Sequence, residues 1–540
     1  MRKNEDFSHE NNKRGLLQVA VRSTQALFFM VFGGILILLV GFASRSYFLK
    51  VDYDLPNGWL LAIGLVAVTM LYLSLRMTSV FLGHRIAGPS YGRINQWLLL
   101  IATLILFYAQ TVIATNLKFK TGWDAGVVFD FAYRTVDNQI GDYSRYFSLY
   151  PNNLLLGWVY IQIMRLYQVV YHNFTIHDII YALIIFNCVI SSITAIVVYR
   201  TVCLLTGRRL SGWMAWCAYA AVVGLSPWFL IPYSDTVGIL FSILMFYLYI
   251  KPHRYELLRW FLIGACLYIG FRVKPTGAIV FIAMACIEIA DLFTRKTDLK
   301  KAIRTAASLL SILVLMHAGY TMLILPSLGF ALNKEKSLGP AHFIKMGLND
   351  KTDGVYLEED VVFSASFGTK NEQNAANMEV IRTRMKDFGV SGYWNFLIRK
   401  ALVNFNSGNF AWAAEGSFYL VLFNRSTALA SRLMSYYYSF GARHHVFLAI
   451  SQALWLAVLS GTFLFSFKRQ YQTQKDRKQA AVIQLSLVGL VMDMMLFEAR
   501  ARYLYVMLPL FIVSSVLGFQ EIGKAAGKIM PKRTSIIPLK

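Results

Sequence analysis

The sequence lacks the cysteine pattern, the cleavage site and the internal repeats that would indicate several common architectures. Its five cysteines lie in or beside apolar segments, and none has C-x-x-C spacing. This odd set argues against a disulfide framework and against a metal cluster, so we expect small core residues. They are Cys188, Cys203, Cys217, Cys266 and Cys286. No Ala-x-Ala type site follows the charged N-terminus, so a cleaved signal peptide is not expected.

Acidic residues are scarce relative to basic ones. The chain has 53 Lys and Arg but 29 Asp and Glu, a formal net charge of +24. Such an excess can indicate nucleic-acid binding, but here the basic residues gather in short loops between hydrophobic segments. Loops of that kind face anionic cytoplasmic lipid. We therefore expect membrane lipid, and no nucleic acid, as their partner.

Apolar residues dominate what is present. They make up 56% of the 540 residues, and the mean hydropathy is +0.49. Stretches of about 18 or more apolar residues recur, the length needed to cross roughly 30 Å of hydrocarbon. The sequence predicts an all-α polytopic protein of the cell membrane with about 12 transmembrane helices. The expected spans cover residues 26–42, 59–75, 97–115, 179–199, 213–230, 236–250, 260–273, 276–293, 306–325, 445–467, 480–497 and 503–519.

The Lys and Arg bias of the loops places both termini in the cytoplasm. Segment 154–171 is treated differently, because Arg165 would be buried in lipid if this segment crossed the membrane. We expect an amphipathic helix in the outer interface, which keeps the later basic loops inside. The expected regions are a cytoplasmic tail (1–24), a membrane domain (25–325) with an external loop (116–178), a long external loop or small subdomain (326–444), C-terminal membrane helices (445–520) and a basic cytoplasmic tail (521–540).

The stretch from residue 121 to residue 153 places acids and aromatics directly after an apolar segment. Charge at a membrane boundary is costly unless it lines a wet cavity or lies on the surface, so this loop is a candidate active-site rim. Asp124 is its strongest candidate, because Gly122 and Gly126 allow a ligand to approach the backbone closely. An ordinary solvated loop acid is the alternative, and Asp130 is the reserve acid.

A further set of polar residues offers contacts for a substrate. Tyr150, Asn152 and Asn153 stand where the expected interfacial helix opens, and their groups suit sugar hydroxyls or a helix cap. Asp235 follows an expected outward helix, and capping the next helix is its simpler explanation. His342 lies in the long external region, where a lone histidine is usually solvated.

Three cations lie near the predicted outer ends of helices, against the Lys and Arg bias. Lys274, Arg500 and Arg502 are donors that suit a phosphate, and the arginines can bind it through two hydrogen bonds each. Two of them have a simpler explanation: the Lys274 side chain can extend to the interface, and Arg500 can pair with Glu498.

Several short motifs occur in the order found in one membrane-enzyme superfamily. They are Gly122-Trp123-Asp124, Tyr150-Pro151, Ser234-Asp235-Thr236, Lys274-Pro275 and the Glu498 to Tyr503 segment EARARY. In these motifs the chain resembles the GT-C glycosyltransferases, which include protein O-mannosyltransferases and aminoarabinose transferases. The YPNN turn and residues 340–348 look closest to a Gram-positive, exosortase-associated branch. The chain departs from the pattern in having one acid at Asp124 where many members carry a pair. It also has Asn152-Asn153 where they carry proline, with or without a lysine.

The resemblance implies an inverting transfer of a sugar from a polyprenyl-phosphate donor to an acceptor hydroxyl on an external protein or polysaccharide. Asp124, with Asp130 in reserve, would be the general base, the carboxylate that takes the proton from the acceptor hydroxyl. The need for a divalent cation stays open, and no metal ligands are assigned. The implied donor-phosphate residues are Lys274, Arg500, Arg502 and Tyr503, and the implied substrate contacts are Tyr150, Asn152, Asn153, Asp235 and His342.

Two other classes of function compete with this one. A multi-helix transporter or lipid flippase is favoured by Glu288 and Asp493, which lie inside expected helices. Such transporters usually have two related halves with a site near the midplane, whereas the special charges here lie near one interface. A non-catalytic scaffold of a polymer-assembly complex would need no acid at Asp124.

Overall fold

The structure is a computed structural model, and it describes residues 2–42, 55–85, 89–139, 141–171, 175–294, 299–468 and 473–529. In these ranges the chain is helical apart from two strands of two residues each and the connecting segments. The strands, β1 (Phe119–Lys120) and β2 (Val421–Leu422), pair antiparallel, with Phe119 opposite Leu422. An all-α fold is therefore confirmed.

Nine helices in the described ranges are long and apolar enough to cross a membrane. They contain α1 (Arg2–Leu36), α2 (Asn57–Arg85), α3 (Pro89–Leu117), α7 (Ile176–Thr206), α11 (Ile279–Thr294), α12 (Leu299–Gly319), α17 (His444–Leu464), α18 (Gln474–Leu496) and α19 (Leu508–Ile529). The remaining three expected spans are also helices, but they are shorter or more charged. They are α8 (Arg209–Tyr219), which a π-helical turn extends to Gly224, α9 (Ser234–Ile250) and α10 (Glu256–Val273). The polytopic architecture is confirmed.

Both expected tails differ from the structure in part. Helix α1 begins at Arg2, so the expected polar tail 1–24 is continuous with the first span. No proline interrupts this stretch, and its charged residues are compatible with a helix. At the other end α19 continues to Ile529, and the rest of the expected basic tail lies outside the described residues.

Small residues let α17 and α19 approach closely in the bundle. A Cβ atom at Gly518 would lie 1.9 Å from the backbone oxygen of Gly461, so neither position tolerates a larger residue without a shift. Beside them the Thr462 and Ser514 hydroxyls share a hydrogen bond of 2.9 Å. Close backbone contact and hydroxyl bonds between helices are typical of packing inside membranes.

The first large loop folds into short helices that pack on the bundle. They are α4 (Asp124–Val136), α5 (Ser144–Leu149), a 3₁₀ turn (Pro151–Asn153) and α6 (Leu154–Val170). Helix α6 packs against α4 and α7, and Arg165 on it is exposed. The helix that we expected in the interface is therefore present, and its depth in the bilayer stays a prediction.

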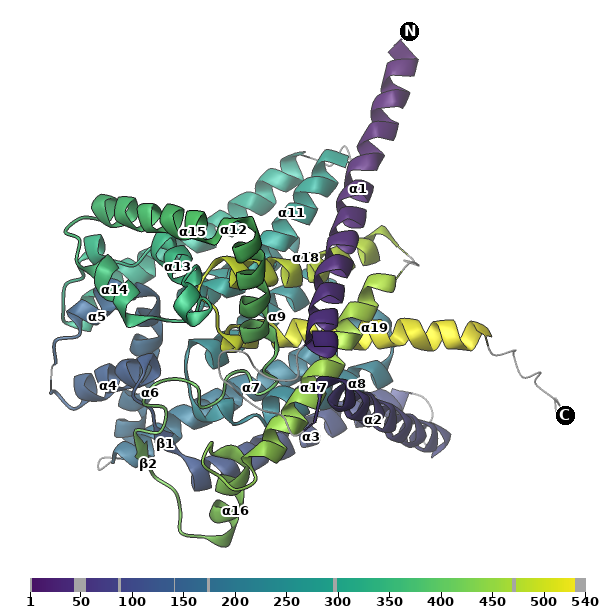
Figure 1. Ribbon diagram of the computed structural model, residues 1–540. Helices are drawn as coiled ribbons and strands as arrows, with labels where there is room; N and C mark the ends of the chain where they lie inside the picture. Colours follow the sequence, from purple (N-terminus) through teal and green to yellow (C-terminus); the bar gives the residue numbers. More distant parts are fainter. Residues whose placement is uncertain are drawn as a thin grey trace.

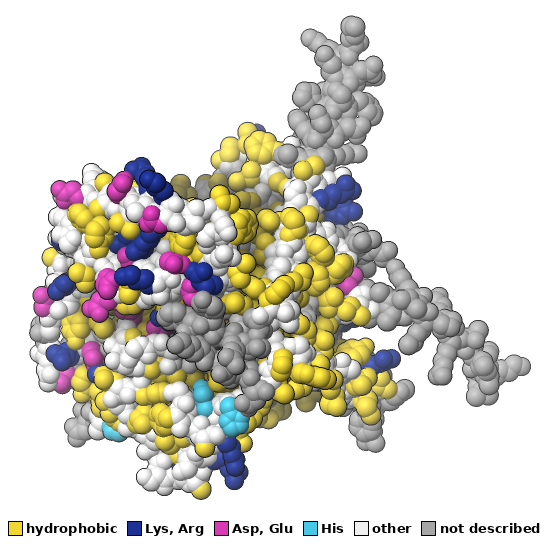
Figure 2. All heavy atoms as spheres, in the orientation of Figure 1, with side chains coloured by type: hydrophobic (Ala, Val, Ile, Leu, Met, Phe, Trp, Pro, Cys, Tyr) yellow, Lys and Arg dark blue, Asp and Glu magenta, His cyan; other side chains and the backbone are white. Residues whose placement is uncertain are grey.

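The expected external region 326–444 divides into two parts. The first contains α13 (Pro340–Gly347), α14 (Glu358–Ala365) and α15 (Lys370–Phe405), which bends at Gly389. Figure 1 shows these helices together at one end of the molecule, and in the same view Figure 2 shows charged side chains of both signs there. The second part, the 406–427 loop, returns to the bundle and buries Trp412 before α16 (Ala428–Tyr437).

Candidate functional site

Four segments that are far apart in the sequence meet at one cluster of charges. Asp124 is the first residue of α4, and Asp235 lies in the first turn of α9. Lys274 follows the last residue of α10, and Arg502 lies in the 3₁₀ helix Ala501–Met507. A carboxylate in the first turn of a helix is stabilised by the exposed backbone N–H groups there. Helix ends therefore position both acids.

Asp235 is the central anion of the cluster. Its carboxylate lies 2.7 Å from the Lys274 Nζ atom and 3.1 Å from the Arg502 Nε atom. The side chain is only 2% exposed. A carboxylate this buried is retained at reasonable cost only beside cations. Asp235 therefore holds two of the three predicted phosphate-binding cations, beyond the capping role that its position suggested.

Glu415, from the 406–427 loop, binds both arginines. Its Oε2 atom lies 3.2 Å from Arg500 Nη2, and its Oε1 atom lies 3.0 Å from Arg502 Nη1. The simpler explanation for Arg500, a pair with Glu498, is thus replaced by a partner that sequence reasoning missed. No spacing or periodicity singles out Glu415, because its loop is far from the EARAR segment in the sequence.

Aromatic rings enclose the cations. The Arg502 guanidinium lies 4.4 Å from the centre of the Trp123 ring, and the Lys274 Nζ atom lies 4.1 Å from that of Tyr503. Trp123 in turn packs edge-on against Tyr233 at 4.9 Å. Contacts of this kind stabilise a cation in a dry environment. Tyr503, predicted to bind phosphate, therefore packs on a cation that is itself a candidate phosphate ligand.

Asp124 belongs to a hydrogen-bond chain. The Tyr146 hydroxyl donates to Asp124 Oδ1 at 3.1 Å, and Asn153 Nδ2 donates to the Tyr146 oxygen at 2.8 Å. Asn153 Oδ1 accepts from Asn152 at 3.2 Å and from the Tyr233 hydroxyl at 3.4 Å. The structure thus brings the two asparagines of the YPNN turn to the predicted catalytic acid.

The protonation of this chain follows from its burial. Burial raises the pKa of Asp124, and the positive charge of Arg502 and the Tyr146 hydrogen bond oppose that rise. Burial and the Asp124 charge raise the pKa of Tyr146 well above its usual value, so its hydroxyl stays protonated and donates. No ion pair of the Asp124 carboxylate occurs within the described ranges. An acid with a raised pKa and a spare oxygen suits proton transfer.

Tyr150 forms part of the wall next to this chain. Its ring lies 5.3 Å from that of Tyr146, and it packs on a small apolar cluster with Leu338 and Met346. Burial and the Asp124 charge raise its pKa. Burial also raises the pKa of Glu498, against the charge of Arg500. Tyr150 and Glu498 thus border the charged cluster.

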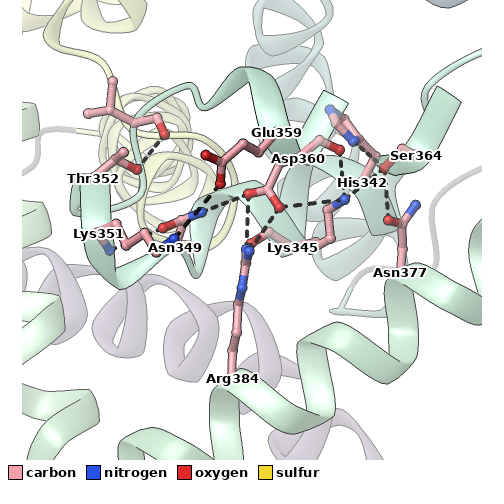
Figure 3. A network of polar contacts seen from close by, with 11 residues as sticks. His342, Lys345, Asn349, Lys351, Thr352, Glu359, Asp360, Ser364, Asn377 and Arg384 are labelled. Carbon is pink, nitrogen blue, oxygen red and sulfur yellow. Dashed lines mark hydrogen bonds and ion pairs between the residues drawn. The ribbon is translucent and has the colours of Figure 1, made fainter. Parts of the chain in front are cut away.

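Two predicted site residues lie elsewhere. Asp130 pairs with Lys120 of β1 at 2.6 Å. His342 is fully buried on α13, where its Nδ1 atom lies 2.7 Å from the Ser364 hydroxyl in the network that Figure 3 shows. Burial and the nearby Lys345 charge lower the pKa of His342 to about 4. The expectation that His342 is solvated is wrong, and its contacts do not include the Asp124 cluster.

The end of α15 fixes the backbone of the EARAR segment. Lys400 is fully buried, and its Nζ atom donates to the backbone oxygens of Gly347 at 2.5 Å and Phe497 at 2.6 Å. Asn404 Oδ1 accepts from the Arg500 backbone N–H at 3.0 Å. Burial lowers the pKa of Lys400 to about 7. The α13–α15 unit thus positions the arginines of the site.

The ion pairs of the cluster are close but poorly aligned as hydrogen bonds. Several of its buried polar atoms have no hydrogen-bond partner. They are both Asp235 oxygens, Glu415 Oε1, Arg500 Nε, and Arg502 Nε and Nη1. All of these atoms except Arg500 Nε lie within 3.1 Å of an oppositely charged partner, so the cluster is neutralised internally without well-aligned hydrogen bonds. A ligand that offers better-aligned acceptors can replace one of the partners. Such a ligand would be anionic, because it would take the place of a carboxylate beside the arginines.

The cluster does not resemble a metal centre. No group of three or more His, Cys, Asp or Glu side chains is placed to hold a metal ion in the part of the chain that the structure describes. The acids here are instead separated by arginine and lysine side chains. We therefore derive no step through a divalent cation.

The charges that favoured a transporter lie in different surroundings. Glu288 of α11 pairs with Lys478 of α18 at 2.7 Å and accepts a hydrogen bond from Tyr249 at 2.5 Å. Lys478 also pairs with Asp291 at 3.0 Å. Asp493 lies near the other end of α18 and is partly buried. Glu288 is thus compensated by a partner on a neighbouring helix.

Comparison with known proteins places the chain in a family. A family model described as "Conserved hypothetical integral membrane protein" matches residues 20–522. The match covers most of the chain, so the protein belongs to this integral membrane family. A search of curated proteins finds no match to the chain.

Proposed function

We propose that this protein is a glycosyltransferase of the cell membrane that uses a polyprenyl-phosphate sugar as donor. The observation that carries the proposal is the position of Asp124, an acid with a raised pKa and no ion pair in the described ranges, beside a buried set of cations. A base next to an anion site is what such a transfer requires. The motif order shared with the GT-C superfamily adds support by analogy.

The residues of the cluster account for each bond and proton of the proposed transfer. The acceptor oxygen attacks the anomeric carbon, the bond from that carbon to the phosphate oxygen breaks, and the phosphate leaves as a stabilised anion. The acceptor proton passes to Asp124, and no general acid is needed. Arg500, Arg502 and Lys274 stabilise the charge that develops on the phosphate. A single displacement inverts the anomeric centre.

An apolar cavity offers room for the lipid part of the donor. It has a volume of about 380 Å³ and is lined by residues from the π-helical turn after α8, from α16 and from α17. Its lining includes Leu225, Leu433, Phe447 and Leu454, together with Gly408 of the 406–427 loop. An isoprenoid chain is a suitable occupant of such a cavity.

The test is transfer by the full-length protein in lipid nanodiscs, with a panel of radiolabelled polyprenyl-phosphate sugars and a cell-envelope extract as acceptor. We expect one donor to give Asp124-dependent transfer to the extract. If no donor in the panel reacts, while a proteoliposome assay shows flux of the same lipids, the transporter alternative replaces the proposal.

The proposal also requires the cluster to face outward. Glu359 of α14 and Arg208 at the start of α8 are both exposed to solvent. We expect a cysteine at position 359 to react with an impermeant maleimide in intact cells, and one at position 208 to react only after lysis, in a cysteine-free background. The reverse pattern would contradict an external active site.

A further inference from the structure

The loop that carries Glu415 has an unusual backbone. Four residues near Glu415 have a positive φ although none is glycine: Phe410, Ala411, Ala413 and Ser417, with φ between 51° and 62°. Residues with a Cβ atom adopt this conformation only at a cost in energy. Strain of this kind persists where surrounding contacts impose it, and it clusters at functional sites.

Contacts at both ends hold this loop in place. The Gly408 backbone N–H donates to Gln452 of α17 at 2.7 Å, and the Leu420 N–H donates to the Lys120 oxygen of β1 at 2.9 Å. Between them Gly416 and Ser417 are exposed. Within the loop Phe410, Ala411 and Trp412 are buried, and the Gly122 backbone N–H donates to the Ser417 oxygen at 2.9 Å. What is free to move is therefore the Glu415 side chain next to the exposed Gly416, rather than the loop as a whole.

The charges of the cluster leave no room for another anion while Glu415 is present. Arg500, Arg502 and Lys274 supply the positive charge, and Asp235 and Glu415 already pair with them. Asp124 and Glu498 are two more carboxyl groups beside the same arginines. A donor phosphate would add negative charge to a buried site whose cations are taken. One carboxylate must therefore leave the arginines before a phosphate binds.

Glu415 is the carboxylate that can leave. Asp235 is fixed in the first turn of α9, a helix that is buried along almost its whole length. Glu415 lies in an irregular loop next to the exposed Gly416, and its two ion pairs with the arginines are not aligned as hydrogen bonds at Oε1. Rotation of its side chain uncovers two guanidinium groups at once. These groups suit the oxygens of a phosphate.

We infer that the Glu415 carboxylate occupies the position of the donor phosphate in the unliganded protein and that the incoming phosphate displaces it. The inference rests on the proposed function for the identity of the ligand. It makes Glu415 a specificity-determining residue, because only an anion that binds both arginines better than this carboxylate gains entry. Gly408 lines the apolar cavity, so the same loop borders the place assigned to the lipid.

The first experiment measures equilibrium binding of a short prenyl phosphate without sugar to the full-length protein in detergent. We expect Glu415→Gln to bind it about tenfold or more tightly than the native protein, since a neutral amide competes poorly for two arginines. A gain in affinity cannot result from misfolding. Glu359→Gln, a change at an exposed carboxylate of α14, is the matched control and should leave the affinity unchanged.

Glu415→Asp provides a second variant if the amide impairs folding. Its shorter side chain keeps the charge but cannot reach both arginines equally, so we expect a smaller gain. Unchanged or weaker binding in a folded Glu415→Gln protein overturns the inference, as does unchanged binding in Glu415→Asp when that variant alone folds.

The second experiment follows the loop directly. A Cβ atom at Gly416 would meet nothing within 4 Å, so Gly416→Cys can carry a small fluorophore in a cysteine-free background. We expect prenyl phosphate to change its emission, and Arg500→Ala to weaken that response. A silent probe under saturating ligand contradicts displacement. If the protein binds prenyl phosphate as expected but transfers no sugar, the proposed function fails while the role of Glu415 stands.

Discussion

Two buried polar networks in this protein contain similar charged residues but differ in how well those residues are hydrogen-bonded. In the network of Figure 3, Asp360 accepts hydrogen bonds from Arg384 at 2.8 and 3.1 Å and from Asn349 at 2.9 Å. Lys345 donates to the Asp360 backbone oxygen at 2.7 Å and to Ser364 at 2.9 Å. Burial disfavours the charge on Asp360, but these bonds hold its pKa below the usual range.

The cluster around Asp235 and Arg502 has its ions at similar distances but not its hydrogen bonds. Its unpartnered atoms belong to charged groups, whereas those left in the Asp360 network are His342 Nε2 and Asn377 Nδ2, on groups that are neutral there. A buried network whose charged groups are hydrogen-bonded makes a structure rigid, whereas charges held by poorly aligned ion pairs can exchange a partner for a ligand. The comparison assigns stability to the first network and binding to the second.

The largest expected effect is a loss of sugar transfer when the acid beside the Asp235 cluster is neutralised. Asp124→Asn keeps the shape and removes the base, so sugar transfer should fall by about 10²- to 10⁴-fold. Asp130→Asn, which breaks only the pair with Lys120, is the matched control and should transfer nearly normally. Initial rates at matched expression decide the result. If Asp124→Asn transfers sugar normally while Asp130→Asn does not, the general base is Asp130 and its assignment to Asp124 is wrong.

Asp124→Asn should also change the thermal stability of the protein. Burial raises the pKa of Asp124, so at neutral pH its ionised form destabilises the folded state. Asp124→Asn should therefore unfold at the same or a higher temperature than the native protein at pH 7. The difference should vanish at a pH below the usual aspartate range, where both states are protonated. The rate of transfer by the native protein should decline as the pH falls through the raised pKa of Asp124, because the protonated acid cannot act as a base.

Arg502→Ala should weaken the transition state for transfer by about 2–4 kcal/mol, as expected for the loss of an electrostatic donor. Arg502→Lys should restore part of this, because an ammonium group cannot replace the planar fork. The measurement is kcat/KM for the donor that reacts. Native values in both variants would remove Arg502 from the site and end the contrast between the networks.

Lys345→Met tests the Asp360 network, where we expect a loss of stability and no loss of activity. It leaves Ser364 and Asp360 with fewer partners, so the free energy of unfolding should fall by about 2 kcal/mol. The kinetics of the folded fraction should not change, because the contacts of Lys345 lie within the α13–α15 unit. Denaturant unfolding and initial rates check the two parts. A change in donor KM with unaltered stability would show that the network takes part in binding.

The smallest expected effect concerns Lys400 and pH. Its folded pKa is about 7, below the ordinary 10.5, so the unfolded chain binds more protons between these values. Stability should rise with pH there by up to about 1.4 kcal/mol per unit. Lys345, whose folded pKa is about 8, adds to the slope only at higher pH. Lys400→Met should therefore flatten the slope between pH 7 and 8, measured by thermal unfolding, and an unchanged slope would exclude Lys400 as its source.

The sequence by itself determined the helices and much of the loop chemistry. Apolar runs act locally, because each must be long enough to cross hydrocarbon and must satisfy its own backbone, so their number and order follow from composition. All twelve expected spans formed helices, and in the described part of the chain nine helices are long and apolar enough to cross a membrane. Asp124 and the YPNN turn also came together, since they lie in one loop.

Tertiary structure alone decided which charges meet. Glu415 reaches Arg500 and Arg502 only because the 406–427 loop returns to the bundle, and His342 lies away from them because α13 buries it against α14. Lys400 fixes the arginine segment through backbone oxygens, which no side-chain pattern encodes. Ion pairs depend on distances of a few ångströms between segments remote in the chain, and such distances follow from packing rather than from any local run of residues.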